Sequence, residues 1–346
     1  MSTRKALLVL GMHRSGTSTL TGLLSHLGCD LPATVMPAND FNPKGYFESL
    51  EVCKLNDAIL ASAGSMWHDW QPLNAAWFES SEAAEFLERG REVLAKEYAE
   101  SALFLLKDPR ICRLLPYWLK VLDHVGVELL VVLPHRNPLE VAESLQVRDG
   151  LHSQLGQLLW LQHVLSAERQ TRDVRRCFLS YDRLLLDWKF ELRRVGQLLG
   201  LNWPRSVEEI TSEVSGFLSP SLRHYSKPKE LILDGSSSST WLSQTYAILD
   251  AWAQHGENIE HRSVLDQVSD AFDKAAPNFA QVVALAQSSF RRSLELEAQI
   301  ASLTAQLEKS AHSEPPAQSE PPASIAAVSL TDRCDDLLSR LATLTK

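Results

Sequence analysis

Short apolar segments recur along the chain and alternate with longer stretches of helical periodicity. Each segment is nearly continuous in hydrophobic character, which is typical of parallel strands that are buried on both faces. Strands that alternate with helices predict a mainly parallel sheet with helices on both faces. The predicted strands cover residues 6–10, 102–106, 128–134 and 177–181.

Apolar residues that recur every three or four positions predict helices over much of the remaining chain. The fold class that we expect is therefore α/β, with a P-loop-type parallel sheet flanked by helices and a C-terminal helical extension. The predicted helices cover residues 50–60, 81–99, 139–147, 155–169, 184–199 and 241–252, then a long helix over 278–309 and a last amphipathic helix over 330–344.

The C-terminal region differs in pattern from the rest of the chain. Leu296, Ile300, Leu303 and Leu307 recur at coiled-coil spacing, although over too few heptads to establish a coiled coil. A Ser-Glu-Pro-Pro-Ala repeat then predicts an extended linker, so we expect the C-terminal helices to mediate self-association or to dock a partner. The predicted units are an α/β domain over residues 1–275, a long helix over 276–310, a linker over 311–327 and a final helix over 328–346.

The turn after the first predicted strand has the residues of an anion site. Gly11 and Gly16 bracket the turn, and a helical pattern follows it. The free N–H groups and the dipole at a helix N-terminus favour an anion, as does the charge of Arg14. The turn and the first helical residues also supply the hydroxyl groups of Ser15, Thr17, Ser18 and Thr19.

Composition narrows the classes of function. The chain has 346 residues, of which 45% are hydrophobic and 22% charged, and a net charge of −9. General nucleic-acid binding needs a basic surface, so we expect no nucleic-acid partner, and an anionic ligand must be held by local charge.

Five scattered cysteines suggest a reducing compartment, and no segment has the length of a membrane helix. We therefore expect a cytoplasmic protein.

The turn differs from the nucleotide-triphosphatase loop G-x-x-x-x-G-K-S/T at one position. Thr17 stands where that loop has its lysine, and the basic residue is Arg14, inside the turn. Arg14-Ser15-Gly16-Thr17-Ser18 resembles the 5′-phosphosulfate loop of sulfotransferases that use 3′-phosphoadenosine 5′-phosphosulfate (PAPS). The resemblance extends from residue 6 to about residue 201, within the bacterial group whose sequences carry HRSGTS and NPKGYFE.

Two later segments carry the same resemblance. Arg136-Asn137-Pro138, followed by Ser144, resembles the segment whose arginine and serine bind the 3′-phosphate of PAPS in this family, although a helix-capping arginine and a buried serine would give the same pattern. Tyr181-Asp182-Arg183 precedes a helix that ends in Leu-Gly-Leu. The resemblance implies these cosubstrate-binding residues: His13, Arg14, Ser15, Gly16, Thr17, Ser18, Arg136, Ser144, Tyr181 and Arg223.

The resemblance also implies catalytic roles. Arg14 and Lys107, from the segment Lys107-Asp108-Pro109, would stabilise charge on the sulfuryl group, so no metal is required. Glu48 is the first candidate for the base that takes the acceptor proton, because related glycan and tyrosylprotein enzymes use a glutamate after the first helix. An acid in the first turn of a helix is the alternative interpretation of Glu48. His68 is the reserve candidate.

The acceptor class rests on analogy and on three tryptophans, Trp67, Trp70 and Trp77, since sugar rings commonly stack on tryptophan. The predicted function is sulfuryl transfer from PAPS to an acceptor hydroxyl on a carbohydrate or glycoconjugate, with PAP as the product. The alternatives are a P-loop nucleotide kinase, which Thr17 disfavours, and a non-catalytic sulfotransferase-like scaffold.

Overall fold

The computed structural model describes residues 4–218, 227–233 and 239–312. Arg223, residues 313–327 of the predicted linker and the predicted last helix lie outside these residues, whereas residues 311 and 312 belong to a helix. The chain divides into two compact units, Met1–Leu294 and Glu295–Lys346. The first unit contains the sheet and all the site residues considered below.

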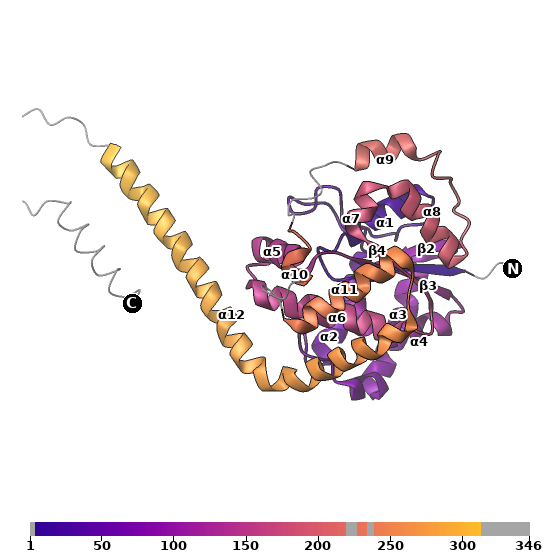
Figure 1. Cartoon of the computed structure of the whole chain (residues 1–346), viewed down its shortest axis with the longest axis horizontal. Helices are drawn as coiled ribbons and strands as arrows, with labels where there is room; N and C mark the ends of the chain where they lie inside the picture. The colour runs from indigo at the N-terminus through magenta and orange to yellow at the C-terminus, as the bar shows by residue number, and fades with distance from the viewer. Residues whose placement is uncertain (1–3, 219–226, 234–238, 313–346) are drawn as a thin grey trace, which may run out of the picture. The chain divides into compact units, whose positions relative to one another are not determined.

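The sheet has four parallel strands in the order β2-β1-β3-β4. It is flanked by helices as the sequence predicts, with α1, α8 and α9 above it and α2, α3, α4 and α6 below it in the view of Figure 1. Leu8 pairs with Leu106 on one side and with Val131 on the other, so β1 lies between β2 and β3. The strands are β1 (Lys5–Val9), β2 (Leu103–Leu106), β3 (Glu128–His135) and β4 (Arg175–Ser180).

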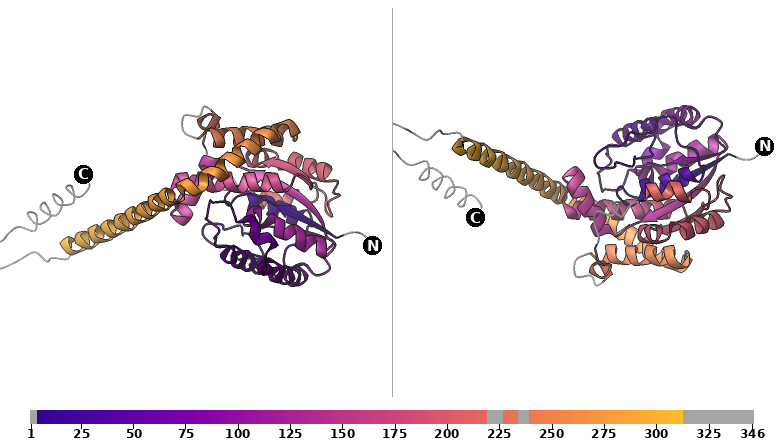
Figure 2. Two further views of the ribbon diagram at one scale, coloured as in Figure 1. Left: turned by 90° about the horizontal axis from the view of Figure 1, so that it is seen from below. Right: turned by 90° about the horizontal axis from the view of Figure 1, so that it is seen from above.

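Two hydrophobic cores lie on opposite faces of the sheet, and Figure 2 shows helices on both of these faces. Alternate residues of β1 point into each core: Ala6 and Leu8 into one, Leu7 and Val9 into the other. The first core is formed with α2 (Leu50–Ser62), α3 (Ser81–Tyr98), α4 (Ile111–His124), α5 (Pro138–Asp149), α6 (Ser153–Gln170), α10 (Glu230–Leu233) and α11 (Thr240–His255). The second is formed with α1 (Thr17–His26), α7 (Tyr181–Leu186), α8 (Trp188–Leu199) and α9 (Thr211–Phe217).

Two helical segments differ from the sequence prediction. The helix predicted over residues 184–199 is two helices, α7 and α8, because Asp187 has φ −146° and its side chain caps the second helix by accepting from Phe190 N. Helix α4 was not predicted, since Pro116 interrupts its pattern. Burial of Trp118 and its apolar neighbours offsets the backbone hydrogen bond that proline cannot make.

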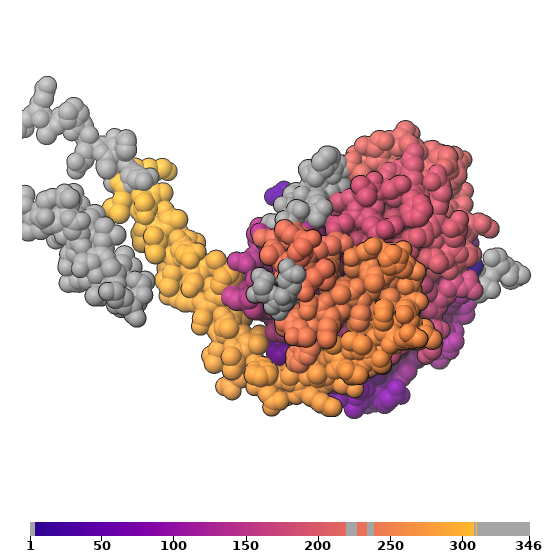
Figure 3. All heavy atoms as spheres, in the orientation of Figure 1, coloured from indigo at the N-terminus to yellow at the C-terminus, as the bar shows by residue number. Residues whose placement is uncertain are grey.

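The long helix α12 (Arg262–His312) begins before its predicted start at residue 278 and continues through Pro277. Its first turns bury Leu265, Val268 and Phe272 in the first core, which explains why the proline does not end it. Together with α11, these turns form the orange part of the face shown in Figure 3. A 3₁₀ helix, η3 (Ile259–His261), directly precedes α12, and another, η1 (Ala75–Glu79), lies between α2 and α3.

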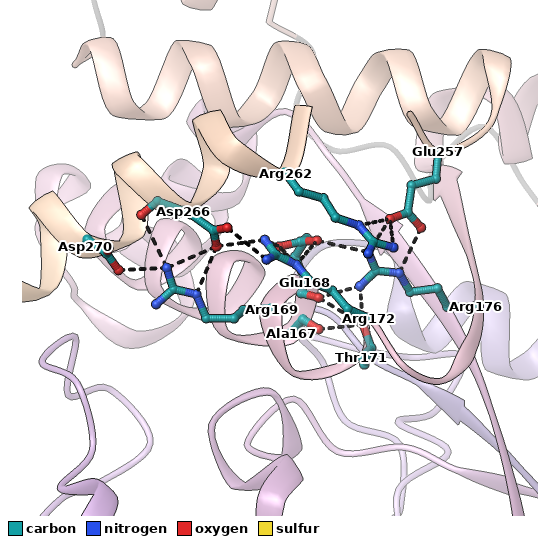
Figure 4. Close-up of polar contacts among 10 residues, drawn as sticks. All are labelled: Ala167, Glu168, Arg169, Thr171, Arg172, Arg176, Glu257, Arg262, Asp266 and Asp270. Carbon is teal, nitrogen blue, oxygen red and sulfur yellow. Dashed lines mark hydrogen bonds and ion pairs between the residues drawn. The ribbon is translucent and has the colours of Figure 1, made fainter. Parts of the chain in front are cut away.

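An ion-pair network fixes the first turns of α12 (Figure 4). Glu168 at the end of α6 is buried and accepts hydrogen bonds from Arg172 at 2.7 Å and from Arg176 at 2.9 Å. Arg172 also pairs with Asp266 of α12, and Arg176 pairs with Glu257, which follows α11. Because the central carboxylate is buried and fully paired, this network specifies how α11 and α12 dock on α6.

Residues 295–312 continue α12 with exposed side chains at Leu296, Ile300, Leu303 and Leu307. Their proposed role in self-association stays a prediction, as do the predicted domain boundaries. Within the described residues, the helices are too short or too polar to span a bilayer.

Candidate active site

The site lies at the point where the order of the strands reverses. The chain passes from β1 to β2 on one side and then crosses to β3 on the other, so a crevice opens between the carboxyl ends of β1 and β3. Arg14 follows β1 and Arg136 follows β3. The guanidinium of Arg136 donates to the backbone oxygen of Arg14 at 3.3 Å, which ties the two strand ends together.

The turn after β1 is shaped by its backbone. Gly16 has φ 84° and is the N-cap of α1, and no side chain caps the N–H groups of this helix. A Cβ atom on Gly16 would lie 2.1 Å from the Tyr181 ring, so glycine is required for both conformation and space. Arg14 also has a left-handed φ of 67°. The hydroxyl of Ser15 is buried and has no partner among the described residues.

Arg14 is held over the crevice by two hydrogen bonds. Its Nε donates to Ser144 Oγ at 2.7 Å and its terminal nitrogen donates to the Phe41 oxygen at 3.0 Å. The sequence assigned Arg14 to the 5′ group and Ser144 to the 3′-phosphate. The two proposed ends of the nucleotide site are thus adjacent and hydrogen-bonded to each other.

Arg136 is oriented from two sides. Its Nε donates to Glu140 Oε2 at 2.7 Å, and its guanidinium lies 5.1 Å from the centroid of the Tyr181 ring. Glu140 is fully buried one helical turn after Arg136. Because Tyr181 also packs against Gly16, this ring fixes the arginine and the turn relative to each other.

Lys107, at the end of β2, reaches the first turn of α1. Its ammonium donates to Ser18 Oγ at 3.1 Å, to the Tyr46 backbone oxygen at 2.9 Å and to the Glu48 carboxylate. The side chains of Lys107 and Glu48 are 2% and 5% exposed, so they form a buried ion pair. The structure therefore brings together three of the residues that the sequence selected, from positions 18, 48 and 107.

Glu48 precedes α2 and is not in its first turn, because Ser49 is the N-cap and α2 begins at Leu50. A short antiparallel pairing anchors it, in which Met36 N donates to the Glu48 backbone oxygen at 2.7 Å. The Cys53 thiol donates to Glu48 Oε2 at 3.4 Å. The helix-dipole interpretation of Glu48 is therefore not supported by its position.

A cluster of Glu48, Cys53 and Asp108 lies beside this pair, with potential metal-ligating atoms within 4.8 Å of one another. Cationic side chains already neutralise it, since Lys107 pairs with Glu48 and Arg110 pairs with Asp108 at 3.0 Å. Burial raises the pKa of the Cys53 thiol, so this sulfur is a poor thiolate ligand. Charge at this cluster is therefore balanced within the protein.

Arg14, Glu48, Lys107, Arg136 and Tyr181 line a cavity of about 680 Å³. Among the residues that the structure describes, six cationic side chains and two acidic ones line it, although the whole chain has a net charge of −9. Such local positive charge in a concave site attracts a polyanionic ligand. The cations are Arg14, Lys44, Lys107, Arg110, Arg136 and Arg148, and the acids are Glu48 and Asp149.

Several of these lining residues were not selected from the sequence. Arg110 follows directly on Lys107, Asp108 and Pro109 at the end of β2, which is a position that could have indicated a site residue. Arg148 comes four residues after Ser144 in α5, and this helical spacing puts both on one face. Lys44 lies before Glu48, within the segment NPKGYFE that contributes to the resemblance, but no separate role was predicted for this lysine.

The histidines and tryptophans are distributed unevenly around the cavity. His13 and Trp67 line it, with ring centroids 5.0 Å apart. His68 packs against Trp67 but is not among the lining residues. Trp70 and Trp77 are buried in the first core, so one of the three tryptophans proposed for the acceptor faces the cavity.

No protein-family model and no curated protein sequence matches the chain. Among solved structures, the sulfotransferase domain of the Synechococcus PCC 7002 olefin synthase is 20% identical, with a TM-score of 0.41, over 71% of this chain and 96% of that domain. The sulfotransferase domain of the curacin biosynthetic pathway is 13% identical, with a TM-score of 0.35, over 78% of this chain and 99% of that domain. Retinol dehydratase in complex with androsterone and the inactive cofactor PAP is 15% identical, with a TM-score of 0.31, over 79% of this chain and 80% of that protein.

Proposed function

We propose that this protein transfers a sulfuryl group from PAPS to a hydroxyl group of an acceptor, most simply a carbohydrate, in the cytoplasm. The observation that carries the proposal is the concentration of cations around the turn after β1, in a cavity with a large positive excess. An anionic group is also suited by three features of the turn after β1: the uncapped N-terminus of α1, the close backbone approach that Gly16 permits, and the buried Ser15 hydroxyl.

Each end of PAPS has candidate partners at this site. The 5′-phosphosulfate would be held by the turn over residues 13–18, with the N–H groups of α1 and the guanidinium of Arg14. The 3′-phosphate would be held by Arg136 and Ser144. The hydrogen bond from Arg14 to Ser144 would then be exchanged for bonds to the cosubstrate, which offers stronger, charged acceptors.

The proposed chemistry is an in-line displacement at sulfur. The acceptor oxygen forms a bond to sulfur while the bond from sulfur to the bridging phosphate oxygen breaks, and the electron pair of that bond stays on the 5′-phosphate of PAP. The acceptor proton passes to Glu48. Lys107, already beside Glu48 and the α1 N-terminus, would stabilise the charge on the sulfuryl and bridging oxygens.

The position of Lys107 also bears on the kinase alternative. In a nucleotide-triphosphatase loop the hydroxyl that corresponds to Ser18 binds Mg²⁺. Here Ser18 Oγ accepts a hydrogen bond from the Lys107 ammonium at 3.1 Å, so a protein cation stands next to the hydroxyl that would otherwise bind the metal. This arrangement favours transfer of the less charged sulfuryl group over transfer of a phosphoryl group with Mg²⁺.

Calorimetric titrations with PAP, ADP and ATP, each with and without Mg²⁺, test the cosubstrate. We expect PAP to bind most tightly and independently of Mg²⁺. Arg136→Ala should weaken PAP by about 10-fold to 100-fold, the range for a lost charged hydrogen bond, and should leave ADP within about twofold. The exposed Arg91→Ala is the control. Preference for ATP with Mg²⁺ would establish the kinase alternative instead.

Transfer itself is tested with sulfur-35 PAPS and a panel of glycosides. Glu48→Gln should lower kcat by about 10²-fold to 10⁴-fold, the usual contribution of a general base, while PAP binding is retained. Full activity in this variant would remove Glu48 from the role of base and bring His68 into consideration.

A further inference from the structure

We call Arg14, Arg136, Glu140 and Ser144, which contact one another where the phosphates of PAPS are proposed to bind, the anion clamp. One face of α5 carries part of the anion clamp and continues beyond it. Starting from Arg136 at the end of β3, every fourth residue along this face has a contact at the site. Glu140 binds Arg136 at 2.7 Å, and Ser144 binds Arg14 at 2.7 Å. Arg148 is the next residue in this series, and it lines the same cavity one turn past the clamp.

Arg148 is held in a defined orientation. Its Nε donates to Asp149 Oδ2 at 2.8 Å, and its guanidinium lies 5.7 Å from the centroid of the Trp67 ring. The end of α5 is itself fixed, because Gln287 Nε2 donates to the Gly150 oxygen at 2.9 Å. The terminal nitrogens of Arg148 have no hydrogen-bond partner within the described part of the chain, although the side chain is only 14% exposed.

Two neighbours of Arg148, His13 and Arg14, make an anion favourable on the side of its terminal nitrogens, whereas Asp149 supplies a carboxylate on the side of its Nε. Burial, and next the charge of Arg148, hold the pKa of His13 well below its ordinary value, so this imidazole is neutral at pH 7. Burial and Arg148 also lower the pKa of Arg14, which means that the two guanidinium groups repel each other. A carboxylate beside Arg148 would relieve that repulsion and pair with an oriented guanidinium.

The position of Arg148 also points to the acceptor rather than the cosubstrate. The phosphate groups of PAPS already have Arg14, Arg136, Ser144 and the turn as candidate partners, whereas Trp67 has no role in the clamp. Trp67 lines the cavity, with Arg148 over its ring and the His13 ring in an edge contact at a centroid distance of 5.0 Å. A flat aromatic surface beside a cation suits a sugar ring that carries an acidic group.

We propose, on the basis of the proposed function, that Arg148, Trp67 and His13 form an acceptor subsite selecting sugars with a carboxylate near the reacting hydroxyl. Arg148 pairs with the carboxylate, Trp67 supports the ring, and the neutral His13 lies beside both. Arg148 is thus a specificity-determining residue, and the substrate class is an acidic glycoside.

The test compares 4-nitrophenyl β-glucuronide with 4-nitrophenyl β-glucoside, which differ in a carboxylate at one carbon. The Kd of each is measured by calorimetry on the full chain, with and without saturating PAP. We expect the wild type to bind the glucuronide about 10-fold to 100-fold more tightly, as expected for a charged hydrogen bond. Arg148→Ala should abolish most of this preference, and Arg148→Lys should keep part of it because it retains the charge without the planar fork.

Arg91→Ala should retain the wild-type preference, and thermal unfolding checks that each variant is folded. The proposal is overturned if the wild type binds both glycosides equally or neither, or if Arg148→Ala keeps the wild-type ratio. It is also overturned if Arg148→Ala weakens PAP as much as the glucuronide, which would assign Arg148 to the cosubstrate. If the wild type does not bind PAP at all, the proposed function is contradicted. In that case the ratio of the glycoside Kd values measured without PAP still tests the acceptor subsite by itself.

Discussion

The buried pair of Lys107 and Glu48 allows a stability prediction with a definite asymmetry. In Lys107→Met the Glu48 carboxylate stays buried and keeps a single weak donor, the Cys53 thiol at 3.4 Å. In Glu48→Gln the ammonium keeps Ser18 Oγ, the Tyr46 oxygen and the new amide oxygen as acceptors. Each substitution leaves one buried charge without its counter-ion, but the ammonium keeps three hydrogen-bond acceptors, whereas the carboxylate keeps one weak donor.

The magnitudes follow from these remaining partners. Removing one member of a buried ion pair costs about 3–5 kcal/mol, which is the loss we expect for Lys107→Met. Glu48→Gln should cost about 1–2 kcal/mol, since the ion pair is replaced by a hydrogen bond from the ammonium to a neutral amide oxygen and the other two acceptors remain. The double variant should be more stable than Lys107→Met alone, because it removes the unpaired carboxylate.

Urea unfolding at pH 7, followed by tryptophan fluorescence, measures these free energies. The exposed pair of Lys54 and Glu51 at 3.2 Å is a matched control, since their side chains are 72% and 29% exposed. Lys54→Met should therefore cost less than about 1 kcal/mol. The reasoning is refuted if Lys107→Met is no more destabilising than Glu48→Gln, or if the two single effects add in the double variant.

Three further predictions concern other parts of the domain. Gly16→Ala should cost at least about 2 kcal/mol by urea unfolding and weaken PAP binding, whereas Gly64→Ala, with φ 70° but open space, should cost about 1 kcal/mol. Equal losses would contradict the clash with Tyr181. Burial lowers the pKa of His163 to about 3, so the folded state binds fewer protons than the unfolded state between pH 6.5 and 3. As the pH is lowered through this window, the unfolding free energy should therefore decrease by up to about 1.4 kcal/mol per pH unit. The decrease should be less steep in His163→Leu, and identical slopes in the two proteins would rule out this role of His163. Glu140→Gln should weaken PAP about 10-fold but AMP much less, because it loosens the arginine proposed for the 3′-phosphate; equal weakening in the titrations would argue against this role.

Local patterns determined the fold class and most of the elements. Strands buried on both faces need continuous apolar residues, and this requirement is visible in the sequence at each of the four strands. Glycine at position 16 was likewise readable, because a sharp turn before a helix restricts the residue types that fit. The roles of the site residues stay predictions, although the structure brings most of the described candidates to one crevice.

The tertiary structure decided which distant residues meet. Lys107 contacts Ser18 and Glu48 because parallel pairing puts the end of β2 beside the end of β1, and register between strands is a long-range property. Trp67 lines the cavity and Trp70 is buried in the first core, although the two residues are only three positions apart in the sequence. A short motif specifies its own backbone, but the charge, exposure and partners of its side chains depend on elements that pack against it from elsewhere in the chain.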